Sequence, residues 1–442
     1  APIPVPDPGR RAYAGGVRVI KRALGAGLLA VGLTAASMVP ALAEGADAPD
    51  FLTPDYQRFQ AQLKPTGDLT APGHDGALRA AAFNSSLSRG YAGELAQDLS
   101  RAGDESASAV AEVIQRTNPD VVLLSDFDYD EDHEAAEGFR THYLQQDQNQ
   151  QQAVDYPYMY VAPTNHGVPT GADLDGNGTV GDATDGFGHG DFPGQHGMVL
   201  YSKHPIQRDG IRTFQNLLWT SMPDNRLPTG EYSPLVRTIL RLNSSTTWDV
   251  PVTIEGNTVH VVAVDPGAAV DEEGNEHRRR NADEIRLISD YVAGGGDADY
   301  ITDDQGHSGG LPDDARFVVL GDLGVGPGQG DSARSATKQL LGNAAVNDPR
   351  PTSPGAEEYG AGDPPAPDAG KLSAPNLRTS IDGAAGALRS DYALASISLD
   401  VAGAGVFWPS ARQPGRALVY GDPAPSGNHR LVWVDIDLPV SD

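Results

Sequence analysis

Short apolar runs, each bounded by Gly, Pro, Asn or Asp, recur along residues 78–438. Runs of this kind predict buried strands, because turn-forming residues at their ends stop the extended chain. The predicted strands are Leu78–Phe83, Val121–Leu124, Gly197–Tyr201, Ile206–Phe214, Val236–Leu242, Trp248–Ile254, Thr258–Val264, Phe317–Leu320, Arg389–Leu394, Gly405–Trp408 and Leu431–Ile436.

Other stretches carry apolar residues at helical spacing. They are Glu94–Arg116, which Gly103 interrupts, Arg279–Val292 and Ala333–Leu341, and a short helix is also predicted at Asp55–Leu63. Many strands with few helices favour a two-sheet α/β or α+β sandwich over a doubly wound Rossmann fold.

Segments rich in Gly, Pro or Asp are predicted as loops and linkers. Residues 163–195 are rich in Gly and Asp, and residues 349–376 are rich in Pro, Gly, Ala and Asp, which favours loop insertions and, in the second case, a mobile one. Residues 44–76 are polar and punctuated by Pro and Gly, as in a linker. The folded domain is therefore predicted to span 77–438.

Residues 1–43 have the order of a secretory signal peptide. Basic residues gather at the start, an apolar stretch of small residues runs from Ala23 to Val39, and Pro40-Ala41-Leu42-Ala43 resembles a cleavage site. The alternative is a membrane anchor, which a short run with Gly and Thr supports poorly. We therefore expect a secreted, extracellular protein without a stable membrane span after signal cleavage.

The net charge and the cysteine content of the chain exclude several classes of function. The 442 residues contain 32 Lys and Arg against 60 Asp and Glu, a formal net charge of −28. A chain this acidic is not built to bind long duplex nucleic acid through a basic surface, so such contacts have to be local or metal-assisted. The absence of cysteine excludes disulfides, thiolate zinc sites and cysteine nucleophiles.

Polar side chains directly follow several predicted strands. These ends are Phe83-Asn84, Leu124-Ser125-Asp126, Val264-Asp265, Leu320-Gly321-Asp322, Arg389-Ser390-Asp391 and Gly427-Asn428-His429. Asp, Asn and Gly also end strands for purely structural reasons. If the strand ends share one sheet edge, however, they present carboxylates, amides and an imidazole to a common cleft.

In their order along the chain, these segments resemble the endonuclease/exonuclease/phosphatase superfamily of deoxyribonuclease-like, metal-dependent phosphoesterases, in particular a secreted bacterial branch. The resemblance is carried by Ala82-Phe83-Asn84, PDVVLLSDFDYD at 119–130, FPGQHGMVLYSKHPI at 192–206, FVVLGDL at 317–323, RSDYAL at 389–394 and SGNHRLVWV at 426–434. It implies an α+β fold, a four-layer α/β/β/α sandwich of two mostly antiparallel sheets. It also implies a hydrolase that uses Mg²⁺ or Mn²⁺.

The resemblance implies that Asn84 and Asp126 hold the metal, with Asn428 as a further candidate ligand. Asp126 stands where the family has Glu, so the charge remains but the side chain is one methylene shorter. Asn428 stands where the family has Asp and keeps an oxygen without the charge.

The implied catalytic positions are Asp322, Asp391, His429 and Asp265. Asp322 would orient the attacking water, and His429, oriented by an Asp, would act on the side of the nucleophile. Asp265 replaces a family His that binds phosphate oxygens, and Gly324 replaces the Asn that assists Asp322. Losses of this kind cost about 10²–10³-fold in rate each, so we expect strongly reduced or absent activity.

Other histidines could replace the imidazole that is lost at position 265. His196, His260 and His277 are the candidates, and a surface position is the favoured interpretation for each.

Residues 173–178, Asp-Leu-Asp-Gly-Asn-Gly, match the first half of an oxygen-rich calcium loop. Asp173, Asp175 and Asn177 would converge on one ion, and Asp182 and Asp185 would close the shell. No long helices are predicted on either side, so this is not an EF-hand. The alternative is a solvated acidic loop.

The first functional hypothesis is a secreted metal-dependent phosphoesterase that acts on nucleic acid, a nucleotide or a small phosphate ester, with its activity impaired by the site substitutions. The acidic composition favours the small ester. The alternative is a catalytically inactive relative that serves as an extracellular binding protein or a calcium-stabilised surface protein.

Overall fold

The computed structural model describes residues 77–268, 276–325, 331–360, 375–382, 386–421 and 423–438. The predicted signal peptide, linker and helix at 55–63 lie outside these residues. Within them, no helix is both long and apolar enough to cross a membrane.

The first sheet has six strands in the order β13-β14-β1-β2-β4-β3. Only β1 and β2 run parallel, and the other neighbours are antiparallel. Its strands are β1 (Ala77–Asn84), β2 (Val121–Ser125), β3 (Tyr158–Tyr160), β4 (Met198–Ser202), β13 (Asp400–Val406) and β14 (Val432–Asp437).

The second sheet also has six strands, in the order β5-β6-β7-β8-β12-β9. Here only β7 and β8 are parallel. The strands are β5 (Arg212–Thr213), β6 (Thr247–Ile254), β7 (Asn257–Val264), β8 (Phe317–Asp322), β9 (Val346–Asn347) and β12 (Asp391–Ser396), and a separate ribbon is formed by β10 (Ser380–Asp382) and β11 (Gly386–Leu388).

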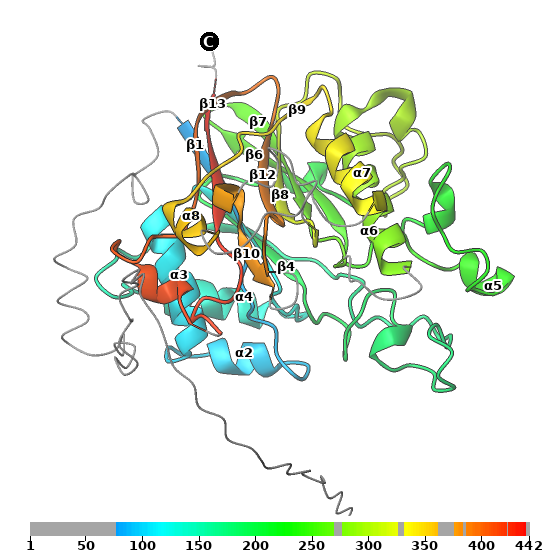
Figure 1. The fold of residues 1–442 in the computed structure, drawn as a ribbon, viewed down its shortest axis with the longest axis horizontal. Helices are drawn as coiled ribbons and strands as arrows, with labels where there is room; N and C mark the ends of the chain where they lie inside the picture. The colour runs from blue at the N-terminus through cyan, green and yellow to red at the C-terminus, as the bar shows by residue number, and fades with distance from the viewer. Residues whose placement is uncertain are drawn as a thin grey trace, which may run out of the picture. The chain divides into compact units, whose positions relative to one another are not determined.

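Helices cover the outer face of each sheet. Figure 1 shows α6 and α7 on one side of the sheets and α2, α3 and α4 on the other. The α-helices of the described residues are α2 (Glu94–Leu99), α3 (Glu105–Thr117), α4 (Glu134–Phe139), α5 (Pro234–Arg237), α6 (Glu276–Ala293), α7 (Asp331–Leu341) and α8 (Pro354–Gly360).

The alternation of side chains along β7 explains this layering. Val261 and Ala263 belong to the core between the two sheets, whereas Val262 belongs to a second core with Ile285 and Ile288 of α6. Successive side chains of a strand point to opposite faces, so a strand that is apolar at every position is covered on both sides. The four-layer sandwich of mostly antiparallel sheets is confirmed.

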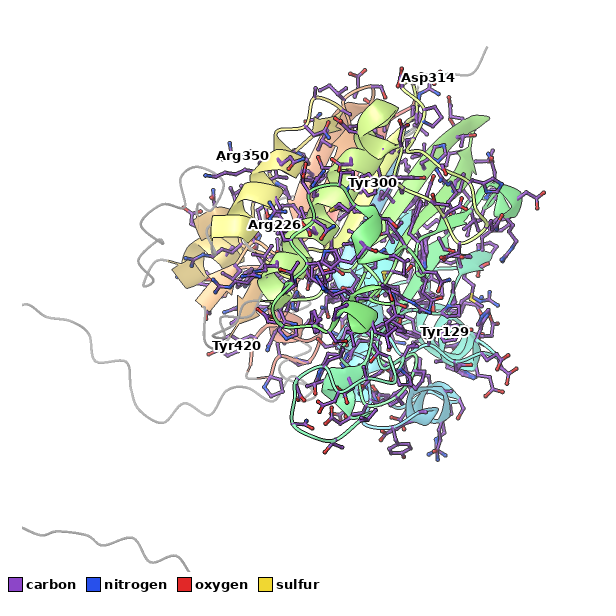
Figure 2. The ribbon with its side chains drawn as sticks, turned by 90° about the vertical axis from the view of Figure 1, so that its right-hand side faces the viewer. Tyr129, Arg226, Tyr300, Asp314, Arg350 and Tyr420 are labelled. Atoms are coloured by element: carbon purple, nitrogen blue, oxygen red, sulfur yellow. The ribbon has the colours of Figure 1, made fainter. Side chains whose placement is uncertain are left out.

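Polar contacts attach the surrounding loops to α6. Arg226 and Tyr300, both labelled in Figure 2, bond to acidic residues of this helix. A guanidinium nitrogen of Arg226 lies 2.6 Å from Asp283, and the Tyr300 hydroxyl donates to Asp290 at 3.1 Å.

The predicted helix at 94–116 is two helices, as the interruption at Gly103 indicated. Gly103 has a φ of 130°, which a helix does not tolerate. Asp104 then begins α3, because its side chain accepts a hydrogen bond from the Ala107 backbone N–H at 2.7 Å.

The predicted strand at Val236–Leu242 is wrong. Ser233 accepts a hydrogen bond from the Val236 backbone N–H, and Pro234 occupies the first turn, so the segment begins as helix α5. Its apolar residues resemble a strand because a short apolar run has no distinctive period. The predicted strand at Ile206–Phe214 shrinks to β5.

The two predicted insertions are more ordered than their composition suggests. Residues 349–360 include α8, where the Gly355 backbone N–H donates to the Trp408 carbonyl at 2.8 Å; residues 361–374 lie outside the described part. In 163–195, the buried Asn165 amide donates to two backbone carbonyls at 2.8 Å. The Arg241 guanidinium stacks 4.2 Å from the ring centroid of Phe187.

Candidate active site

Strand register brings the predicted acids of the second sheet to one edge. Val264 pairs with Gly321 in the parallel β7–β8 ladder, so Asp265 and Asp322 follow side by side. Asp322 pairs directly with Asp391 in the antiparallel β8–β12 ladder. Three carboxylates from distant parts of the sequence therefore meet at the carboxyl end of β8.

The first sheet brings its predicted residues to the same place. Asn84 pairs with Ser125 at the carboxyl ends of the parallel β1 and β2, next to Asp126. The amide Nδ2 of Asn84 donates to Oδ2 of Asp322 at 3.2 Å. This hydrogen bond joins the ends of the two sheets.

His429 precedes β14 and lies against the carboxylates of the second sheet. Its Nδ1 is 3.0 and 3.1 Å from the two oxygens of Asp391 and 3.5 Å from Oδ2 of Asp322. Thr379 Oγ1 donates to Asp391 Oδ2 at 2.8 Å and fixes that carboxylate. Burial lowers the pKa of His429, but the two carboxylates outweigh burial and raise the pKa to about 10. His429 is therefore a cation at neutral pH.

The acids of the cleft repel one another. Burial and then the neighbouring Asp391 raise the pKa of Asp322, and burial followed by Asp322 and Asp126 raises the pKa of Asp265 well above its ordinary value. Gly324, which has no side chain to offer, contributes its backbone N–H to Asp322 Oδ1 at 2.8 Å. This part of the site carries more negative charge than the surrounding protein neutralises.

Asp126 pairs with a histidine that the sequence analysis did not assign to it. Nδ1 of His196 lies 2.5 Å from Oδ1 of Asp126. The ring of His166 meets that of His196 edge to face, with centroids 5.8 Å apart. His196, for which a surface position was favoured, is partly exposed but is not isolated, because the polar turn before β4 returns alongside β2 and brings its imidazole to Asp126.

The remaining predicted positions lie apart from this cluster. Asn428 is exposed, and in the described residues its backbone carbonyl accepts from Ile381 N–H at 2.9 Å while its side chain has no contact to the cleft acids. His260 pairs with Asp249 at 2.9 Å near the start of β8, at the opposite end from Asp322, and His277 is exposed on α6.

The cleft residues fit a hard divalent cation. Carboxylate oxygens of Asp322 and Asp391 and a ring nitrogen of His429 lie within 4.8 Å of one another. While His429 is protonated, only the two carboxylates of this cluster can bind a cation. Carboxylates with one amide oxygen are the donors that Mg²⁺ and Mn²⁺ prefer, and the raised pKa values of Asp265 and Asp322 mark charge that a cation would neutralise. Asn84 and Asp126 would hold the cation, and Asp322 lies next to them through its hydrogen bond with Asn84.

The predicted calcium loop is compact. Carboxylate oxygens of Asp173, Asp175 and Asp185 lie within 4.8 Å of one another. Asn177 Nδ2 donates to Asp175 at 2.9 Å and to Asp182 at 2.8 Å, so it contacts this acidic cluster through its amide nitrogen.

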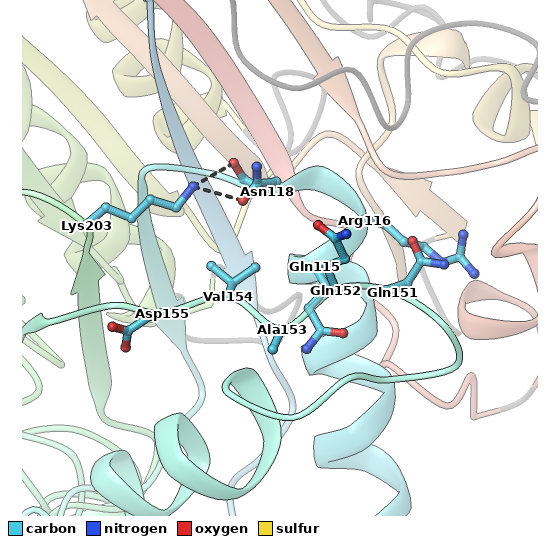
Figure 3. A pocket seen from close by; sticks show the side chains of 9 residues that line it. All are labelled: Gln115, Arg116, Asn118, Gln151, Gln152, Ala153, Val154, Asp155 and Lys203. Carbon is cyan, nitrogen blue, oxygen red and sulfur yellow. Dashed lines mark hydrogen bonds between the residues drawn. The ribbon is translucent and has the colours of Figure 1, made fainter.

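A separate cavity of about 410 Å³ lies at the far end of the first sheet. Asn118, before β2, and Lys203, after β4, line it, and Lys203 Nζ donates to Asn118 Oδ1 at 2.9 Å (Figure 3). Asp126 and His196 stand at the other ends of the same two strands. The cavity is therefore not part of the candidate site.

Several solved structures are similar to part of the chain. Among solved structures, the endonuclease/exonuclease/phosphatase from Beutenbergia cavernae is 16% identical with a TM-score of 0.44 over 82% of this chain and 72% of that one. A family protein from Leptotrichia buccalis is 11% identical with a TM-score of 0.43 over 82% and 100%. A Staphylococcus aureus beta toxin mutant with bound magnesium ions is 14% identical with a TM-score of 0.36 over 81% and 98%.

A search of curated proteins gave no match. The sequence profile of the Endonuclease/Exonuclease/phosphatase family, in contrast, matches residues 89–426, which is most of the chain and includes the ends of β2, β8 and β12. The chain belongs to the endonuclease/exonuclease/phosphatase family.

Proposed function

We propose that this protein is a metal-dependent phosphoester hydrolase whose substrate is a small phosphate ester or a nucleotide. The observation that carries the proposal is the meeting of Asn84, Asp322, Asp391 and His429 at one edge of both sheets. A bound divalent cation supplies charge neutralisation at the phosphoryl oxygens and lowers the pKa of a coordinated water.

Side chains of the protein would contact the phosphoryl group and the attacking water. His429, held by Asp391 and charged at neutral pH, donates a hydrogen bond to a phosphoryl oxygen. Asp322, held by Asn84 and by the Gly324 backbone, accepts a hydrogen bond from the attacking water.

We propose a slow enzyme. Gly324 leaves the water with one side-chain partner fewer, and Asp265 places a carboxyl group where a donor to phosphate is expected. Each loss costs about 10²–10³-fold, without simple additivity. The net charge of −28 disfavours long duplex DNA as the substrate, since its phosphates are repelled before any local contact forms.

The test is hydrolysis of a chromogenic phosphodiester and a phosphomonoester by the purified chain with Mg²⁺, Mn²⁺, Ca²⁺ or EDTA. We expect turnover that EDTA and His429→Ala abolish. His204→Ala is the matched control, because His204 lies at the far end of β4 and its side chain is similarly half-buried. A folded protein with no turnover above His429→Ala in any metal would contradict the proposal and support the alternative, an inactive relative that binds phosphate esters.

We also propose that residues 1–43 direct export and are removed. The order of basic, apolar and small residues supports this. Mass spectrometry of protein recovered from culture medium should find a mature N-terminus at Glu44, and retention of residues 1–43 in cell membranes would support the anchor instead.

A further inference from the structure

The Asp126–His196 pair is held in place from both sides. The Phe127 backbone N–H donates to the Gly197 carbonyl at 3.1 Å, and the His196 backbone N–H donates to Asp128 Oδ1 at 3.1 Å. Asp128 is itself buried and also accepts from Ser88 Oγ at 2.7 Å. The segment before β4 is therefore fixed to the segment after β2, and His196 is not a mobile surface side chain.

Both members of the pair have unusual backbones. Asp126 has a φ of 53° and His196 a φ of 51°, in the left-handed region that non-glycine residues seldom occupy. Strained conformations of this kind concentrate at functional sites, where the surrounding structure holds them. Here the strain turns the carboxylate and the imidazole toward each other across two facing loops.

The pair leaves one imidazole nitrogen available. Nδ1 of His196 faces Asp126, and among the described residues Nε2 has no protein partner. The side chain is 38% exposed, so it is open to the cleft solvent. An imidazole anchored at one nitrogen and free at the other is suited to contact a ligand.

The pair also borders the acids of the other sheet. Asp126 follows Ser125, which pairs with Asn84, and the Asn84 amide donates to Asp322 of the other sheet at 3.2 Å. Through Asp126, His196 therefore lies at the sheet edge where Asn84, Asp322 and His429 gather.

We propose that His196 is a second histidine that contacts the phosphoryl group of the substrate through Nε2, with Asp126 holding Nδ1. The proposal rests on the proposed function, because it concerns the same cleft. It assigns to the turn before β4 the phosphate contact that Asp265 cannot make.

Paired substitutions separate contact from positioning. His196→Asn keeps a donor near the Nδ1 position, and so the bond to Asp126, but has no atom at Nε2. His196→Gln keeps a polar atom near Nε2 but gives up the bond to Asp126. His204→Ala, after the other end of β4, controls for the general loss of a histidine.

The measurement is titration calorimetry with inorganic phosphate at saturating Mg²⁺, with circular dichroism to verify folding. We expect His196→Ala and His196→Asn to weaken phosphate binding by roughly tenfold or more, as expected for a lost charge-assisted hydrogen bond, with His196→Gln less affected and His204→Ala unchanged.

Three outcomes would overturn the inference. They are unchanged binding in His196→Ala, no phosphate binding by the wild-type chain, and a binding defect of His196→Ala that His196→Asn does not show. The third outcome would make His196 a positioning residue for Asp126. Turnover measured in parallel distinguishes failure of the proposed hydrolase function from failure of the His196 inference. Phosphate binding that depends on His196 without turnover would contradict only the hydrolase, and turnover that ignores His196 would contradict only this inference.

Discussion

Asp265 is the residue at which this site departs most from the pattern that its family resemblance implies. Its carboxyl group stands beside Asp322 at the ends of parallel strands, and burial together with Asp322 and Asp126 raises its pKa well above the ordinary value. A buried acid among acids costs stability unless it holds a proton or a cation neutralises it. The cleft is therefore less stable empty than it would be with a bound cation.

Asp265→Asn should stabilise the metal-free protein. An unfolded aspartate loses its proton near pH 4, whereas the folded one holds it to higher pH. Over that window the folded state binds more protons, so the wild-type free energy of unfolding falls as pH rises. Urea unfolding in EDTA should therefore show a gap in favour of Asp265→Asn that widens from about pH 4 to about pH 7. A gap that stays constant with pH would mean that Asp265 titrates normally.

At the scale of elements, the insertion 163–195 matters because it brings His166 against the ring of His196, the residue that directly follows the insertion. Its glycines are not equivalent. Gly167 has a φ of 68°, and a Cβ there would lie 1.8 Å from the carbonyl oxygen of Phe192; Gly171 has a φ of 78° and no atom within 4 Å of such a Cβ. Both glycines therefore have a left-handed backbone, but only Gly171 has room for a Cβ atom.

Gly167→Ala should therefore destabilise the protein far more than Gly171→Ala. The left-handed backbone costs an alanine about 1–2 kcal/mol at either position, and overpacking adds about 1–3 kcal/mol at Gly167 alone. Urea unfolding of the two variants measures the difference directly. Equal losses would show that the insertion moves freely enough to relieve the clash.

The acidic cluster of Asp173, Asp175 and Asp185 stays a predicted calcium site. If Ca²⁺ binds there, thermal unfolding should shift upward in Ca²⁺ relative to EDTA, because a ligand that binds only the folded state stabilises it. Asp175→Asn should remove most of the shift, and Asp191→Asn, an exposed acid of the same insertion, should leave it intact. A shift that Asp175→Asn leaves unchanged would place the Ca²⁺ elsewhere.

At the scale of the whole molecule, the net charge of −28 governs response to salt. Self-repulsion of a strongly acidic chain is screened within about 10 Å at about 0.1 M salt. We expect the melting temperature in EDTA to rise between about 0.05 M and about 0.5 M NaCl. A flat or falling melting temperature would mean that opposite charges are already well paired on the surface.

The sequence by itself determined the long central strands, the main helices and the order of the polar strand ends, because apolar periodicity and turn residues are local signals. The prediction from sequence was wrong at α5, where the capping Ser233 and Pro234 start a helix in a segment whose apolar run resembles a strand. It also missed α8, because the small and polar residues of this helix resemble a loop. Asn84, Asp322, Asp391 and His429 could be predicted as candidate site residues because the first three are the end residues of core strands and His429 lies shortly before one.

Only the tertiary structure decided which of the predicted residues meet. Asn428 is one residue from His429 in sequence, yet it is exposed while His429 contacts Asp391. His196 joins Asp126 across 70 residues of chain, through a turn whose positive φ angles no periodicity reveals. Contacts of this kind depend on register between distant strands and on strained loops, and both are set when the two sheets pack together and not by any local stretch of sequence.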